Sequence, residues 1–136
     1  MAILDALPGV VVSISAAGKE LIEFEDHQEN LQGPLAGKTV LRCLESVSGT
    51  EFAVNLTVSS SFVFDCPNIV FRVHVDGNFI VGKYFGPLKV SGSHRTRTVS
   101  GMYAVLPDGS SGLRKFKFNS IKTSNLSLGD LHHYIH

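Results

Sequence analysis

Side chains that could bind a ligand are concentrated in the second half of the chain. Arg95 and Arg97 supply hydrogen-bond donors, Tyr84 and Tyr103 supply flat rings, and His74 supplies a polar imidazole on a predicted strand. On a shallow face, such types can hydrogen-bond a sugar beneath an aromatic ring. We therefore take these five residues as the candidate ligand-binding set. Tryptophan, a preferred ring for sugar contacts, is absent, which lowers the rank of carbohydrate binding.

The motifs of the common enzyme classes are absent from the sequence. It has no Gly-x-Ser-x-Gly elbow, Gly-x-Gly-x-x-Gly turn, Gly-x-x-x-x-Gly-Lys-Ser/Thr loop, His-Glu-x-x-His pair or Cys-x-x-Cys pair. We expect a protein that is not an enzyme and has no catalytic residues and no cofactor. His132 and His136 have a spacing that would place both on one side of a helix, but terminal histidines without further fixed ligands are usually solvated. No metal site is predicted.

Length and composition indicate one globular domain spanning residues 1–136. Hydrophobic residues make up 43% and charged residues 18%, and no apolar run is long enough to span a bilayer. The first residues, MAILDALPGVVV, lack the basic start of a secretory signal, so we expect an intracellular, cytosolic protein with no membrane partner. In that compartment Cys43 and Cys66 are expected as thiols, with a disulfide between them as the alternative.

Charge is balanced overall but polarised along the chain. Residues 1–68 contain three basic and nine acidic residues, and residues 69–136 contain nine basic and three acidic residues. In a sandwich whose strands interleave, these charges are expected to meet within one domain. A basic functional face and head-to-tail self-association are the alternatives. A net charge of zero makes nucleic acid an unlikely partner.

The clearest structural signal is a hairpin within residues 68–90. Ile69, Phe71, Val73 and Val75 alternate with more polar residues, as on a strand with one apolar face. Asp-Gly at 76–77 favours a two-residue type I′ turn, and a three-residue loop is the alternative. The remaining strands are expected to gather around this hairpin.

The first half of the chain predicts two further hairpins. Residues 10–15 and 19–25 would turn at 16–18, with Ile22 and Phe24 facing inward and Glu23 and Glu25 outward. Polar residues 26–38 predict a long loop. Residues 39–47 and 51–58 would pair around 48–50, with Phe52, Val54 and Leu56 alternating against polar or small residues.

The second half predicts shorter elements around the central hairpin. Residues 62–64 would form a short edge strand, and residues 96–106 one strand with Val99, Tyr103 and Val105 in one phase. A turn at 107–112 leads into residues 114–118, where Phe116 and Phe118 share a face. Residues 127–136 have helical spacing and predict a short terminal helix or a loose tail.

About eight or nine short strands with frequent turn signals predict an all-β, antiparallel β-sandwich or jelly roll. At this level the sequence resembles a known family. The segments LPGVVVSI, LIEFED, CLESVSGTEFAVNLTV, FRVHVDG and RKFKF are similar to those of small fungal proteins known only as a domain of unknown function. The resemblance runs from about residue 7 to 121, whereas the segment at 122–125 departs from the acidic run of that family. It implies a fungal, mainly β, intracellular protein and transfers no site residues.

Together these features predict a non-enzymatic binding or interaction module that self-associates into a homo-oligomer. Self-association is expected from the charge polarity and from the apolar segments 10–12 and 62–64, which would be exposed edges unless something covers them. A carbohydrate or protein ligand is expected, and a lectin-like carbohydrate-binding protein is the alternative function.

Overall fold

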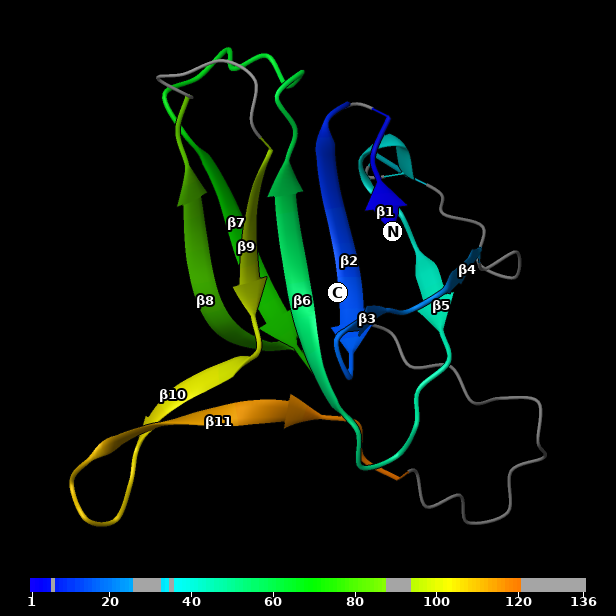
Figure 1. The fold of residues 1–136 in the computed structure, drawn as a ribbon. Helices are drawn as coiled ribbons and strands as arrows, with labels where there is room; N and C mark the ends of the chain where they lie inside the picture. Colours follow the sequence, from blue (N-terminus) through cyan, green and yellow to red (C-terminus); the bar gives the residue numbers. More distant parts are fainter. Residues whose placement is uncertain (6, 26–32, 35, 88–93, 121–136) are drawn as a thin grey trace.

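The computed structural model describes residues 1–5, 7–25, 33–34, 36–87 and 94–120 (Figure 1). Within these residues the chain forms eleven strands and one turn of 3₁₀ helix. The strands are β1 (Ala2–Ile3), β2 (Val10–Ala16), β3 (Lys19–Glu20), β4 (Glu23–Glu25), β5 (Arg42–Leu44), β6 (Glu51–Val58), β7 (Ile69–Val75), β8 (Asn78–Phe85), β9 (Arg95–Val99), β10 (Gly101–Val105) and β11 (Ser111–Lys117), and the helix is η1 (Ala36–Lys38).

The largest sheet is built around β6, not around the predicted hairpin. On one edge, β6 pairs along its length with β2, from Val10↔Val58 to Ala16↔Phe52. On the other edge it pairs first with β11 and then with β9. Strands β1 and β3 pair with the outer edge of β2, and β10 pairs with β11. All these ladders are antiparallel, so the predicted all-β, antiparallel class is confirmed.

A separate hairpin, β7–β8, packs against the inner face of this sheet. Alternate residues of β6 are buried, including Val54, Leu56 and Val58, and they form one cluster with Val73 of β7 and Phe85 of β8. Figure 1 shows the hairpin behind β6 and β9. The two layers give a sandwich-like arrangement whose core lies between them.

The predicted turn of the central hairpin is confirmed. Val75 pairs with Asn78, which leaves a two-residue loop. Asp76 and Gly77 have φ values of 49° and 77°, the left-handed values that a type I′ turn requires. The predicted apolar face is confirmed too, because Ile69, Phe71 and Val75 are partly buried and Val73 is 6% exposed. The three-residue loop is therefore excluded.

The predicted orientation of β4 is wrong. Strand β3 leaves the β2 hairpin after two residues, and β4 pairs with β5 instead. Ile22 and Phe24 are 74% and 54% exposed. The side chain of Glu23 is only 6% exposed, because its carboxylate lies 2.9 Å from the amino group of Met1. The predicted inward positions of Ile22 and Phe24 and the outward position of Glu23 are therefore wrong, whereas Glu25 is exposed as predicted, at 64% of its side chain.

The predicted hairpin between residues 39–47 and 51–58 does not form. The turn around Gly49 is present, but β5 pairs with β4 and not with β6. Strand β6 has the predicted bounds, and Phe52, Val54 and Leu56 are buried as predicted. Because β2 and β9 or β11 already occupy both edges of β6, β5 must take another partner.

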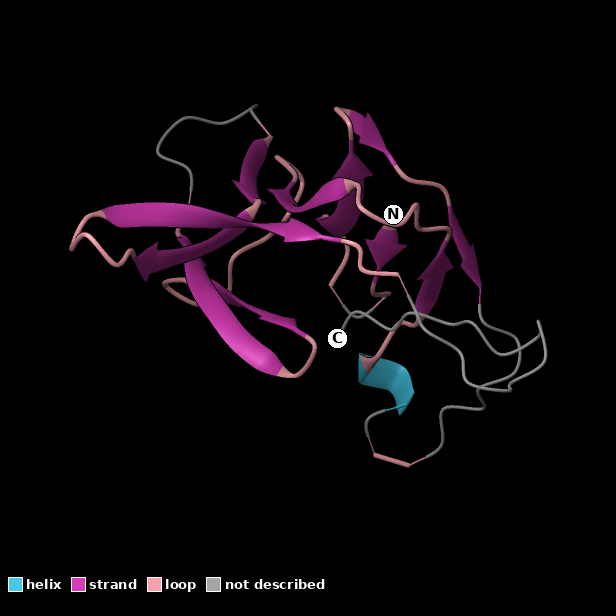
Figure 2. Cartoon of the chain, turned by 90° about the horizontal axis from the view of Figure 1, so that it is seen from below, coloured by secondary structure: helices cyan, strands magenta, loops and turns pink. Residues whose placement is uncertain are grey.

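The predicted strand 96–106 is two strands. Strand β9 pairs with β6, and after Ser100 the chain bends so that β10 pairs with β11. Val99 is 4% exposed, whereas Tyr103 and Val105 are 79% and 76% exposed, so the expected common phase is wrong. The hairpin of β10 and β11 extends away from the other strands (Figures 1 and 2). We call residues 101–115 of this hairpin the arm.

Two segments expected as exposed edge strands have other roles. Strand β1 covers residues 11 and 12 of β2. Residues 62–64 form no strand, and Phe62 and Phe64 pack edge to face with centroids 4.9 Å apart, partly buried against the core. The predicted edge strand at 62–64 is therefore wrong, and β1 covers part of segment 10–12, so neither segment supports self-association.

Some predicted features lie outside the described residues. They are the terminal helix at 127–136, His132, His136, the departure at 122–125 and most of the loop at 26–38. Among the described residues, no helix combines the length and apolar character needed to cross a bilayer.

Candidate binding surfaces

The structure separates the five predicted ligand-binding residues into two groups. His74 and Tyr84 lie on the outer face of the β7–β8 hairpin. Arg95 and Arg97 lie on β9 and face the core side of the sheet, opposite Val58 and Leu56 in the pairing register. Tyr103 belongs to neither, because it lies on the arm. No single ligand-binding face contains all five.

The outer face of β7–β8 is an exposed surface with two aromatic rings. Tyr84 and Phe79 are 66% and 57% exposed. Between the Tyr84 and Phe79 positions along the hairpin, Arg72 pairs with Gly82, which has no side chain that projects from the sheet. His74 contacts the ring of Phe79 with centroids 5.5 Å apart. The face therefore combines exposed rings with hydrogen-bond donors, as the sequence predicted for two of the five residues.

Arg95 and Arg97 lie at the open edge of the core against one aromatic ring. Both guanidinium carbons are 5.7 Å from the ring centroid of Phe85, which is 1% exposed. Arg95 also lies 5.9 Å from the Phe64 centroid and donates a hydrogen bond to the carbonyl of Gly86. These cation–π contacts fix where the two charges lie.

A hollow of about 240 Å³ lies where β8 meets the end of β9 and the base of the arm. Its lining includes Lys83, Thr98 and Tyr103, together with apolar residues of β8 and the arm. Lys83 pairs with Phe71 and is therefore on the core-facing side of its strand, like Phe85 two residues later. Sequence analysis missed Lys83. The signal available in the sequence was that Lys83 alternates with Val81 and Phe85, which places it on the same face of the strand.

The arm carries most of its apolar side chains in contact with solvent. Tyr103 pairs with Leu113 and shares a face with Val105. Their exposed fractions are 79%, 41% and 76%, and Met102 and Leu106 are exposed by 38% and 45%. Monomeric proteins rarely expose contiguous apolar surface of this kind without a binding role. The exposure of these side chains could not be predicted from the sequence, because the same alternation is typical of a buried strand.

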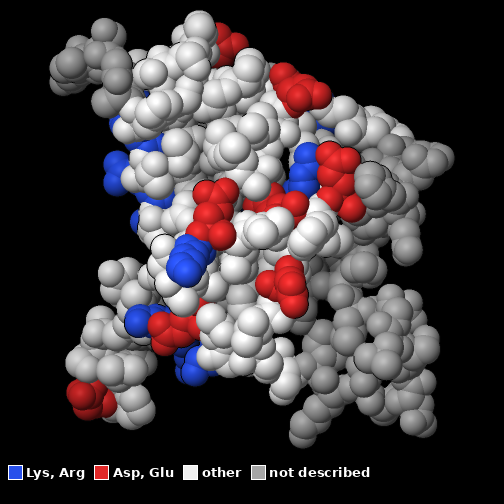
Figure 3. All heavy atoms as spheres, turned by 45° about the vertical axis from the view of Figure 1, so that its right-hand side comes forward, with Lys and Arg blue, Asp and Glu red and all other residues white. Residues whose placement is uncertain are grey.

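The opposite end of the sheet is acidic and also exposes apolar side chains. Figure 3 views this end and shows acidic groups across its centre, with several Lys and Arg side chains toward the left and others beside the acidic groups. Glu20 and Glu25 are more than half exposed, at 56% and 64% of their side chains. Ile22 and Phe24, between them in the sequence, are exposed as well. We call residues 20–25 the acidic strip.

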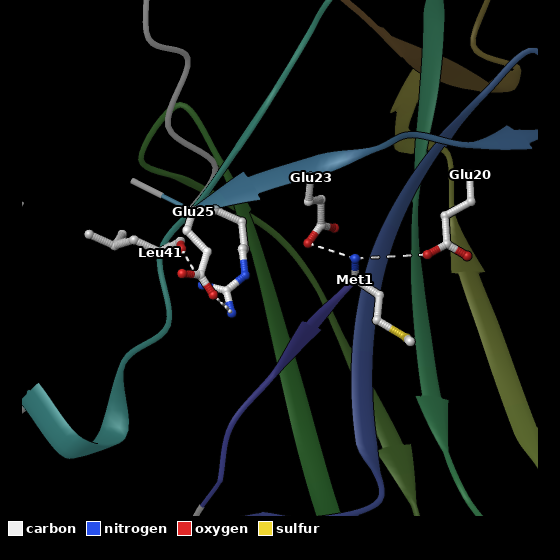
Figure 4. A network of polar contacts seen from close by, with 6 residues as sticks. Met1, Glu20, Glu23, Glu25 and Leu41 are labelled. Atoms are coloured by element: carbon white, nitrogen blue, oxygen red, sulfur yellow. Dashed lines mark hydrogen bonds and ion pairs between the residues drawn. The ribbon is translucent and has the colours of Figure 1, made fainter. Parts of the chain in front are cut away.

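Ion pairs tie the acidic strip to its own half of the chain (Figure 4). The Met1 amino group lies 2.9 Å from Glu23 and 3.9 Å from Glu20, and Arg42 lies 3.7 Å from Glu25. Arg42 also donates a hydrogen bond to the carbonyl of Leu41 at 2.9 Å.

Charges of the two halves meet at a single ion pair among the described residues. Lys115 Nζ lies 2.9 Å from Glu51 Oε2, and both side chains are more than half exposed. The expectation that the two halves would neutralise each other within one domain is therefore met only at this point. The other bases of the second half that the structure describes form no ion pair with a described acid.

The outer face of the main sheet carries small, polar side chains. Asn55 bridges two strands, donating to Ser15 Oγ at 3.0 Å and accepting from Thr98 Oγ1 at 2.9 Å. Thr57 and Thr96 are hydrogen-bonded at 2.9 Å. A shallow hollow of about 470 Å³ follows, lined by backbone turns and by the Glu51–Lys115 pair. These side chains bond to each other, so they offer few groups for a ligand.

The described residues hold no cluster of three or more His, Cys, Asp or Glu side chains arranged to bind a metal ion. Cys43 is partly buried and Cys66 is exposed, and they do not form a disulfide. Cys66 Sγ lies 3.3 Å from the carbonyl oxygen of Asn68.

Comparisons with known proteins give one match. No curated protein matches the chain, and no solved structure matches it. A family model does match, over residues 9–131, and its description is "Domain of unknown function (DUF7918)". The match extends over nearly all the strands described above. The chain belongs to the family of the domain of unknown function DUF7918.

Proposed function

We propose that the protein is a non-enzymatic interaction module that self-associates through its arm. The observation that carries this proposal is the exposed apolar face of Tyr103, Val105 and Leu113 on a hairpin that projects from the body. Strands β10 and β11 already hydrogen-bond to each other along one edge. A partner would therefore be stabilised mainly by the burial of the arm's apolar side chains. Aromatic and aliphatic groups of this kind dominate the energetics of protein interfaces.

The partner we propose is a second copy of this chain, bound through the acidic strip. Basic side chains lie where the arm joins the main sheet, and Arg114 and Lys117 are exposed there. The strip offers the complementary combination, carboxylates at Glu20 and Glu25 beside the exposed Ile22 and Phe24. Two different surfaces on one chain make a head-to-tail contact, and such contacts produce rings or open chains of subunits.

Light scattering coupled to size exclusion tests this proposal. The wild-type protein is expected to show a mass that rises with concentration and falls as salt is raised from about 50 mM to about 500 mM, because salt screens the exposed charges. Replacing Tyr103 and Val105 together by serine is expected to give a monomer. Both side chains are largely exposed, so the free energy of unfolding should change by less than about 1 kcal/mol.

Val63→Ser is the matched control, because Val63 is 82% exposed but lies outside the arm. It should leave the mass of the oligomer unchanged. A wild-type monomer at every concentration and salt would refute self-association. An oligomer unaffected by the Tyr103 and Val105 changes would refute the role of the arm.

The second candidate function is carbohydrate binding on the outer face of β7–β8. The observation that favours it is the exposure of Tyr84 and Phe79 beside Arg72 and His74 on one flat face. The expected result is signal on a glycan array that a free sugar competes away and that Tyr84→Ala removes. Tyr103→Ala, a change of an equally exposed tyrosine, should retain the signal. Loss of signal in both variants, or no signal at all, would refute this function.

Other features inferred from the sequence stay predictions. They are the fungal origin, the cytosolic location, the lack of enzymatic activity, of a cofactor and of a metal, and the single-domain organisation. The five candidate residues lie on separate surfaces of the molecule, so they do not form one common site.

A further inference from the structure

We propose that Lys83, Arg95 and Arg97 form a binding site for a tetrahedral oxyanion, a phosphate or sulfate group, at the open edge between β8 and β9. This site is separate from the arm and from the outer face of β7–β8. The inference therefore goes beyond the proposed function and does not depend on it. The three residues come from two strands and lie on the core-facing side of each.

The two arginines are held close together although they have the same charge. Each guanidinium carbon lies 5.7 Å from the Phe85 centroid, so the two carbons are at most twice that distance, 11.4 Å, apart. The ring fixes both side chains by cation–π contact. Two guanidinium groups that contact one ring concentrate positive charge at this edge of the sheet, where an anion is attracted to both.

The described residues supply no anion at this edge. None of their ion pairs includes Lys83, Arg95 or Arg97. Arg95 uses one terminal nitrogen for the carbonyl of Gly86, and its buried Nε has no hydrogen-bond acceptor. Buried donors are normally satisfied, so this nitrogen lacks the acceptor it would normally have among the described residues. Arg97 is exposed, so its donors remain available to a ligand.

The chemistry of the edge fits an oxyanion better than a carboxylate-bearing protein chain or an apolar group. Guanidinium groups bind phosphate and sulfate through paired hydrogen bonds, and an ammonium group adds a mobile charge. Lys83 lies on the same face of β8 as Phe85, two residues away, and Phe85 is the ring that both arginines contact.

A nuclear magnetic resonance titration of the full chain with sodium sulfate, at ionic strength held constant with sodium chloride, tests the site. Backbone amide shifts are expected to be largest at Phe85 and at residues 95–98, and to saturate. Arg97→Gln should weaken sulfate binding by about tenfold, because one charged pair of hydrogen bonds is lost. Lys117→Gln, which removes an exposed base of β11, is the matched control and should bind as the wild type does.

Arg95 packs against the core edge, so Arg95→Gln could lower stability. Lys83→Gln provides a second variant, and it should weaken binding without changing the unfolding temperature measured in chloride. Titrations with inorganic phosphate and with a phosphorylated monosaccharide distinguish the two sources of the oxyanion. Tighter binding of the sugar phosphate identifies a phosphate group that is part of a small molecule. Equal binding identifies the free ion. Shifts spread over all exposed bases, or equal binding by Arg97→Gln and wild type, would overturn the proposal.

Discussion

Strand β6 and strand β10 have similar alternating sequences but opposite environments. In β6, Phe52, Val54, Leu56 and Val58 are 1–7% exposed. In β10, Tyr103 and Val105 are 79% and 76% exposed. Strand β6 has partners on both edges and the β7–β8 hairpin over its inner face, whereas β10 pairs only with β11 among the described residues. Alternation therefore predicts a strand in both cases, but burial requires a second layer of protein.

The difference assigns different roles to the two regions. The apolar residues of β6 stabilise the fold, because burial removes their surface from water. Those of the arm contribute little to the folded monomer and remain available for a partner. A mutation in β6 should therefore change stability, and one in the arm should change association. Three predictions test this comparison.

The largest expected effect is on stability when a β6 side chain is shortened. Leu56 is 3% exposed and lies in the middle of the strand, so Leu56→Ala leaves a cavity between the two layers. We expect the free energy of unfolding to fall by about 2–5 kcal/mol. Val105→Ala, at a residue that is 76% exposed, should change it by less than about 0.5 kcal/mol. Urea unfolding monitored by circular dichroism measures both.

This comparison fails if the two variants lose similar stability in dilute protein. Equal losses would mean that the arm packs against the body in solution. Measurement at increasing protein concentration separates that outcome from self-association, because an oligomer contact stabilises the folded chain only as concentration rises.

Local signals in the sequence predicted local structure well. The Asp76-Gly77 turn, the bounds of β6 and the shared face of Phe116 and Phe118 were all confirmed, since each depends on neighbours within one or two strands. Partner choice was not predictable in this way. The pairing of β5 with β4, at Phe24↔Cys43, depends on which edges of β6 other strands already occupy.

The junction between the sheet and the arm depends on Gly101. A Cβ at this position would overlap the carbonyl group of Arg114 and would lie 2.8 Å from the Cα of Lys115. Because those atoms belong to the backbone, Gly101→Ala must separate β10 from β11 or change the bend. We expect a loss of about 1–3 kcal/mol in the free energy of unfolding. The arm should also become more susceptible to protease.

Gly37→Ala is the matched control for this change. A Cβ at Gly37 would have no atom within 4 Å, so stability should stay unchanged or rise slightly. If Gly101→Ala is as stable as Gly37→Ala and equally resistant to protease, the close approach at the junction does not constrain the arm. The arm would then not be constrained where it joins the sheet, although its apolar face is exposed.

The candidate sites show the same limit of sequence-based prediction. Arg95 and Arg97 share one face because they alternate on one strand, as the sequence implies. The sequence could not show that both arginines contact Phe85 of β8, or that His74 and Tyr84 lie on the opposite face of that hairpin. Those relations depend on how two layers stack, which alternation within a strand does not encode.

The smallest expected effect concerns the turn at the tip of the arm. Asp108 Oδ1 accepts hydrogen bonds from the Ser110 hydroxyl at 2.5 Å and the Ser110 backbone N–H at 2.9 Å. These bonds, the hydroxyl first, lower the pKa of Asp108 below the ordinary value of 3.8. A lowered pKa means that the charged form stabilises the folded state above pH 3.8, and that this contribution is lost as pH falls through the lowered pKa.

Asp108→Asn should therefore lower the urea midpoint slightly at pH 7, and the difference in midpoint from wild type should narrow as pH falls below 3.8 through the lowered pKa. The effect is small because water surrounds the carboxylate and screens it. Lys117→Gln, which changes an exposed charge away from the turn, should show no such narrowing. A difference that stays constant as pH falls would mean that the turn is held by its backbone alone. In that case the arm would keep its shape without any side chain, and its exposed apolar face would depend only on the pairing of β10 with β11.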